Sequence, residues 1–133
     1  MRSTNFIKNE YYLLKSSGVA GSSIFIDQED ILRFLFLLLY LQSPIVINNV
    51  GWYAASFIKK NRFGINSNKI EQIHKEREVE LLSFKIQEGE FSLVVHNLED
   101  GVASVYMQRV LTGYSKYFNS KYKKRGHVFQ GPF

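Results

Sequence analysis

The segment Ile31–Leu41 constrains the fold of this chain most, because its apolar residues cover almost the whole surface of a helix. Asp27 and two further acids precede it, where they complement the helix dipole, and Pro44 follows it. The pattern predicts a helix over about 28–42 that ends before the proline. A helix that is apolar nearly all round is buried on more than one side, so other elements have to cover it.

Two alternating segments, Val79–Ile86 and Phe91–Val95, predict a β-hairpin with its turn at Gln87–Gly89. In the first segment Leu82, Phe84 and Ile86 would share one face, and in the second Phe91, Leu93 and Val95 would do so. Asn9–Lys15 mixes aromatic residues with leucine and runs into Ser-Ser-Gly, so it predicts an earlier strand.

A second long helix is predicted over about 102–122, with Asp100 as its N-cap and Gly126 as its stop. Its apolar residues follow a four-three-four spacing on one face, at Met107, Leu111, Tyr114 and Phe118.

The order of these elements predicts one α+β domain over 1–133, with an irregular excursion at about 43–78. Short helices at about 52–60 and 69–75 are expected inside the excursion. Two helices on one face of an antiparallel sheet form the ferredoxin-like arrangement. That arrangement requires a final strand, and we expect it to be missing, because the chain ends at Phe133.

Composition excludes several kinds of site. The chain is 45% hydrophobic and has no cysteine, so it can form a core but no disulfide, thiolate zinc site or cysteine nucleophile. The longest apolar run, Phe34–Leu41, is far shorter than the roughly 20 residues that span a bilayer. We expect a soluble, cytoplasmic protein that does not associate with membranes.

The charge distribution points to a polyanion as partner. Residues 1–100 hold eleven bases and twelve acids, whereas Gly101–Phe133 holds six bases and no acid. Aromatic residues lie between these bases and could stack on unpaired nucleobases. The predicted DNA-binding residues are Arg109, Tyr114, Lys116, Tyr117, Lys121, Lys123, Lys124, Arg125 and His127. The alternative is that the tyrosines are half-buried in the core and the lysines form an ordinary solvated surface.

Two stretches carry a resemblance to a known family. Val102–Phe133 contains Tyr-Met-Gln-Arg, Gly-Tyr-Ser-Lys-Tyr-Phe-Asn and Lys-Tyr-Lys-Lys-Arg-Gly-His-Val-Phe-Gln-Gly, and Asn9–Phe36 contains Glu-Tyr-Tyr, Gly-Val and Arg-Phe. Both stretches resemble the REP-associated branch of the single-tyrosine HUH transposases. The resemblance implies a domain that binds single-stranded or hairpin DNA.

The resemblance also implies a catalytic apparatus, which this chain has in altered form. Family members hold Mg²⁺ or Mn²⁺ on a His-x-His pair in a central strand, and a tyrosine on a later helix attacks the phosphodiester. Glu90 and Ser92 occupy the two histidine positions, and Glu90 is the one candidate metal ligand. The nucleophile helix would follow Phe133, so we expect no cofactor and no catalysis, and Tyr114 and Tyr117 are not expected to be nucleophiles.

The leading hypothesis is therefore a transposase-like DNA-binding domain without catalytic activity. A second hypothesis is an active, metal-dependent transposase that receives its tyrosine from a partner chain. A third is an inert relic or interaction module. A sheet edge left uncovered by the lost strand would favour pairing with a second copy of the chain.

Overall fold

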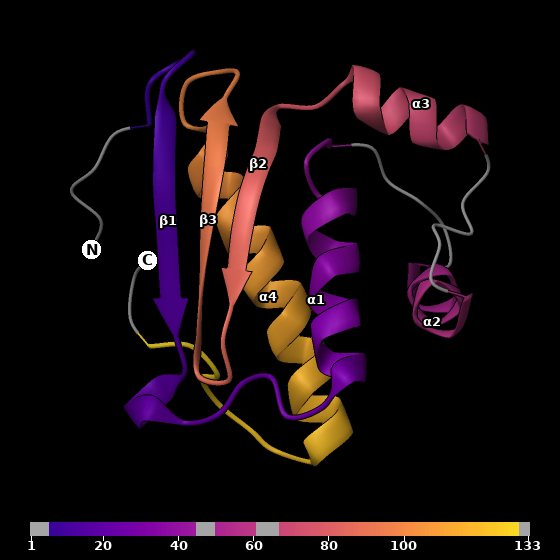
Figure 1. Ribbon diagram of the computed structural model, residues 1–133, viewed down its shortest axis with the longest axis vertical. Coiled ribbons are helices and arrows are strands. Elements are labelled where there is room, and N and C mark those ends of the chain that lie inside the picture. The colour runs from indigo at the N-terminus through magenta and orange to yellow at the C-terminus, as the bar shows by residue number, and fades with distance from the viewer. Residues whose placement is uncertain (1–5, 45–49, 61–66, 131–133) are drawn as a thin grey trace.

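The computed structural model describes residues 6–44, 50–60 and 67–130, and its fold is α+β with a three-stranded antiparallel sheet (Figure 1). The strands are β1 (Tyr11–Ser17), β2 (Val79–Ile86) and β3 (Glu90–Asn97), in the order β1-β3-β2. The α-helices are α1 (Gln28–Tyr40), α2 (Val50–Lys60), α3 (Ser67–Lys75) and α4 (Val102–Tyr122), and a short 3-10 helix, η1 (Val19–Gly21), follows β1. These bounds lie within two residues of the predicted ones for β1, α1, α3 and α4.

The central strand β3 has one buried and one accessible face. Phe91, Leu93, Val95 and Asn97 are buried, and the residues between them are partly or fully exposed. Figure 1 shows α1 and α4 together on one side of the sheet. The predicted hairpin is confirmed, since Ile86 pairs with Phe91 and the amide of Gln87 donates to the carbonyl of Glu90.

The predicted faces of β2 are wrong in part because a β-bulge lies between Leu81 and Ser83. Leu81 pairs with Val95 and Phe84 pairs with Leu93, so Leu81 shares the helix side with Phe84. Leu82 does not belong to that set, and its side chain is 48% exposed. A bulge inserts one residue into the alternation, which a two-residue period cannot reveal.

Helix α1 begins as the sequence predicts. The Asp27 side chain accepts a hydrogen bond from the amide of Asp30, and the Asp30 side chain accepts one from the amide of Asp27, which forms a capping box.

The prediction that this helix is covered on more than one side is confirmed. Phe34 contacts Phe91 of the sheet and Tyr114 of α4, with ring centroids 4.6 and 5.5 Å apart. On another side Phe36 contacts Phe57 of α2 at 5.7 Å.

Helix α4 has the predicted buried face, since Met107, Tyr114 and Phe118 are buried. Its N-terminus differs from the prediction. Gly101, in the left-handed region with φ of 78°, is the N-cap, and the side chain of buried Asn97 accepts a hydrogen bond from the amide of Ala103.

Both ends of α4 therefore correct the sequence prediction. Asp100 instead accepts a hydrogen bond from the amide of Lys8, so contacts with the N-terminal segment replace its expected capping role. At the other end Lys123, with φ of 54°, takes the left-handed C-cap conformation three residues before Gly126.

The segment predicted to be an irregular excursion contains two helices, α2 and α3, and Figure 1 shows them on the far side of α1 from α4. Their predicted positions are confirmed, although each helix starts two residues earlier than expected. None of the helices described is long and apolar enough to cross a membrane.

Leu38→Ala should destabilise the protein, because Leu38 of α1 is completely buried. Truncation of a buried leucine costs about 2–5 kcal/mol, which would lower the melting temperature by several degrees. Val105→Ala is the control, since Val105 of α4 is 56% exposed. Unfolding by denaturant would measure both, and equal losses of stability would show that the core is placed wrongly.

Candidate nucleic-acid interface

The structure separates the predicted DNA-binding residues into an inner and an outer group. Tyr114 is completely buried, and Tyr117 and Lys121 are partly buried against α1. Lys116, Lys123, Lys124, Arg125 and His127 are exposed.

Tyr114 belongs to the core, so its predicted role in DNA stacking is wrong. Its hydroxyl donates a hydrogen bond to the carbonyl of Ile24, and its ring packs against Phe25 and Phe34. Burial raises the pKa of Tyr114, and the nearby charge of Asp30 raises it further. A neutral phenol without access to solvent can neither stack on a base nor attack a phosphate.

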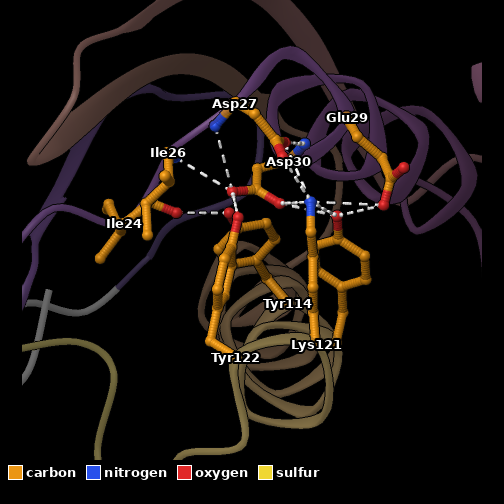
Figure 2. Close-up of polar contacts among 9 residues, drawn as sticks. Ile24, Ile26, Asp27, Glu29, Asp30, Tyr114, Lys121 and Tyr122 are labelled. Carbon is orange, nitrogen blue, oxygen red and sulfur yellow. Dashed lines mark hydrogen bonds and ion pairs between the residues drawn. The ribbon is translucent and has the colours of Figure 1, made fainter.

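The inner group surrounds Asp30, a fully buried carboxylate near the start of α1 (Figure 2). Its oxygens accept hydrogen bonds from the hydroxyls of Tyr122 (2.6 Å) and Tyr117 (2.7 Å) and from the Lys121 ammonium (2.9 Å). The amide of Ile26 donates a further bond at 3.0 Å. We call Asp30, Tyr117, Lys121 and Tyr122 the Asp30 cluster.

Two opposing effects set the protonation of Asp30. Burial alone raises the pKa of the carboxyl, but the hydrogen bonds from Tyr122, Tyr117 and Lys121 outweigh burial and lower the pKa to about 2. Asp30 is therefore ionised at neutral pH, and its negative charge is compensated by donors from the last three turns of α4.

Lys121 is part of this cluster, which corrects its prediction as a phosphate contact. Its Nζ lies 2.8 Å from Asp27, 2.9 Å from Asp30 and 3.4 Å from Glu29. Burial lowers the pKa of Lys121, but the hydrogen bonds to the two aspartates raise it more, so the ammonium stays charged. Acids from the first turn of α1 neutralise that charge, and it is not available to DNA.

Tyr117 is also held by the cluster rather than displayed for stacking. Its hydroxyl bonds to Asp30, and the Arg33 guanidinium lies 4.9 Å from the ring centroid. Burial and the hydrogen bond to Asp30 raise the pKa of Tyr117, which keeps the phenol neutral. Both features count against a role as a nucleophile or as a base platform.

The outer group lies where α4 ends. Lys123, Lys124, Arg125 and His127, which we call the basic end, are all exposed. Among the described residues none of the four forms an ion pair. Lys124 Nζ lies 5.7 Å from the centroid of the Phe118 ring.

A groove of about 290 Å³ runs beside the basic end. Val19, Ser22 and Ser23 line one wall, and Phe118, Lys124 and Arg125 line the other. The groove therefore combines hydroxyl groups, an aromatic edge and cations, which are the groups that contact the sugar, base and phosphate of a nucleotide.

Arg109 does not join the basic end, although both were predicted as one interface. It lies on α4 about 21 Å of helix rise from Lys123, and its Nη1 is 3.4 Å from the carbonyl oxygen of Ser43. Lys116 is exposed on α4 between the two.

Comparisons with protein-family models, with curated proteins and with solved structures find no match for this chain. Its function is therefore inferred from its own residues.

Glu90 and Ser92 lie on the face of β3 that points away from the helices. Ser92 pairs with Lys15 of β1 and with Lys85 of β2, so its cross-strand neighbours are cations rather than metal ligands. Within the described ranges, no three His, Asp or Glu residues lie close enough together to hold a metal ion.

The sequence interpretation missed the role of Asp30. Acids at Asp27, Glu29 and Asp30 were assigned to the helix dipole, and the lysine and tyrosines of α4 were assigned to DNA. The available signal was an excess of polar hydroxyls on the buried side of α4, because a buried tyrosine hydroxyl needs a partner.

Asp30→Asn should destabilise the fold at neutral pH, because an amide cannot accept hydrogen bonds from all the donors that Asp30 satisfies. Loss of one partner in a buried ion pair costs about 3–5 kcal/mol. The folded pKa lies below the ordinary value of about 3.9, so this stabilisation is complete above that value and is lost as the pH falls towards about 2.

The measurement is the free energy of unfolding of both proteins between neutral pH and the acid limit. The difference between them should shrink as the pH falls. Glu99→Gln is the control, because Glu99 is exposed and forms only a 3.8 Å ion pair with Lys8. A constant difference across this pH range would contradict the assigned charge of Asp30.

Proposed function

We propose that this chain binds single-stranded or hairpin DNA at the basic end of α4 and does not cleave it. The observation that carries the proposal is the grouping of four exposed, unneutralised basic or imidazole side chains beside a groove with hydroxyl and aromatic walls. Cations that have no protein counter-ion can bind phosphates and release the condensed counter-ions of DNA.

The geometry favours an unpaired strand over an ordinary basic surface. Phe118 forms part of the groove wall, and an aromatic edge next to cations suits a nucleobase together with its phosphate. Lys121 was removed from the interface by its acidic neighbours, whereas Lys123, Lys124 and Arg125 were not. The fold thus sorts the basic residues, and those it leaves exposed lie together.

We further propose that the fold is ferredoxin-like and related to that of the REP-associated tyrosine transposases. The sheet order β1-β3-β2 is that of a ferredoxin-like domain in which a further strand would lie beside β1. The backbone after α4 supports this, because Gly18 bridges to Phe129 and the amide of Gln130 donates to Ser17 at 2.8 Å. An uncovered remainder of the β1 edge would suit pairing with a second copy.

The proposed activity is binding without catalysis and without a cofactor. Ser92 is a poor metal ligand and has lysines on both sides, which would repel a divalent cation. Tyr114 and Tyr117 are held neutral within the fold. The proposal places the protein in the cytoplasm with its DNA, and a chain without cysteine has no disulfide for a reducing compartment to break.

The double variant Lys123→Gln with Lys124→Gln should bind a labelled hairpin oligonucleotide more weakly than the unchanged protein, whatever its sequence. Each lost phosphate contact should reduce the slope of log affinity against log salt by about 0.7 on single strands. Fluorescence anisotropy over a salt series would measure both quantities.

The matched control is Lys59→Gln with Lys75→Gln, which removes the same charge from exposed positions on α2 and α3. Lys121→Gln should instead lower stability and leave the salt slope of the folded protein unchanged. Equal slopes for the Lys123/Lys124 variant and the charge-matched control would refute the proposed interface.

The unchanged chain should form no covalent adduct with a labelled hairpin substrate in Mg²⁺ or Mn²⁺, because no described tyrosine is both accessible and activated. Denaturing electrophoresis would detect an adduct. If one formed and Tyr117→Phe abolished it, the protein would be an active enzyme and the assignment of Tyr117 to the Asp30 cluster would not describe its function.

A further inference from the structure

The second feature that suits a ligand is the sheet face opposite α1 and α4, which none of the described helices covers (Figure 1). Tyr11, Leu13 and Lys15 alternate along β1 on this side, and all three are exposed. We call the surface formed by these residues and their cross-strand neighbours the open face.

The strand register arranges the open face in rows across all three strands. One row is Lys15, Ser92 and Lys85, because Ser92 of the central strand pairs with both lysines. Directly opposite side chains in antiparallel strands have Cβ atoms about 4.5–5.5 Å apart. Two ammonium groups therefore flank one hydroxyl donor.

No acid neutralises this row. Lys15 and Lys85 are exposed, and neither forms an ion pair with a described residue. Glu90 follows on the same face of β3, but its cross-strand partner is Ser17 rather than a lysine. Two uncompensated like charges beside a hydroxyl form a site for an anion.

The rows beyond it are apolar and aromatic. Leu13 pairs with Val94, and in the next row Tyr11 stacks on His96 with ring centroids 4.5 Å apart and planes at 12°. The aromatic row lies four residues along the strand from the lysine row, which is about 13 Å. The Tyr11 side chain is 62% exposed and Leu13 is 59% exposed.

We infer that the open face binds the backbone of single-stranded DNA, with a phosphate on the Lys15–Ser92–Lys85 row and a neighbouring base over Leu13 and Tyr11. This inference rests on the proposed DNA-binding function and adds a second site to it. The lysines supply the positive charge and Ser92 donates a hydrogen bond, so the phosphate is held without a metal ion.

Charge decides between DNA and a second copy of this chain as the occupant. A two-fold contact between open faces would bring four lysines towards one surface with no acid to pair with them. A nucleic acid strand instead provides negative charge for the lysines and an apolar ring for the leucine and tyrosine.

The test compares the double variant Lys15→Gln with Lys85→Gln against the charge-matched Lys59→Gln with Lys75→Gln. The probe is an end-labelled oligothymidylate, with affinity measured by anisotropy over a salt series in the presence of a chelator. Loss of two phosphate contacts should reduce the salt slope by about 1.4 relative to the control. Ser92→Glu, which places a carboxylate between the lysines, should weaken binding more than Ser92→Ala.

The possible results separate this inference from the proposed function. If Lys123→Gln with Lys124→Gln weakens binding but Lys15→Gln with Lys85→Gln behaves as the control, the open-face site is refuted and the basic end stands. If only the Lys15/Lys85 variant weakens binding, the open face stands and the basic end is refuted. If the unchanged protein does not bind, both are refuted. A change in self-association in ultracentrifugation, without a change in DNA affinity, would make the open face a contact between copies.

Discussion

The ionised carboxylate of Asp30 is the interaction on which the arrangement of the two long helices depends. It lies completely buried near the start of α1, and donors from Tyr117, Lys121 and Tyr122 reach it from the last turns of α4. A buried charge without partners is strongly destabilising, so α1 and α4 have to meet in this register. The cluster thereby fixes the position of the C-terminal end of α4, where the basic end begins.

The same interaction divides the positive charge of the last third of the chain. Lys121 faces the acids of the first turn of α1, whereas Lys123 and Lys124 follow the helix end and face solvent. The left-handed conformation of Lys123 turns the backbone away from the helix axis at this point. Residues two positions apart therefore have different roles, one in holding the fold and the other in the proposed contact with DNA.

The two faces of the sheet differ in the same way. Leu93 and its neighbours on β3 face the core, while Ser92 lies on the opposite face between Lys15 and Lys85. An antiparallel sheet can keep one face towards water, and this one carries cations in one row and an aromatic pair in another. Both proposed DNA contacts therefore lie on surfaces whose charge the fold leaves uncompensated.

The sequence by itself determined the secondary structure and the fold class. Period-two alternation in Val79–Ile86 and Glu90–Asn97, the capping acids of α1 and the spacing in α4 are local signals, and the elements follow them closely. Only the tertiary structure decided which charged residues stay exposed. Tyr114 and Lys121 match the pattern of a nucleic-acid contact in sequence, but Ile24, Asp27 and Asp30 occupy them from about 90 residues away. The Lys15–Ser92–Lys85 row likewise joins three strands far apart in the chain, because cross-strand register is set by pairing and not by sequence neighbours.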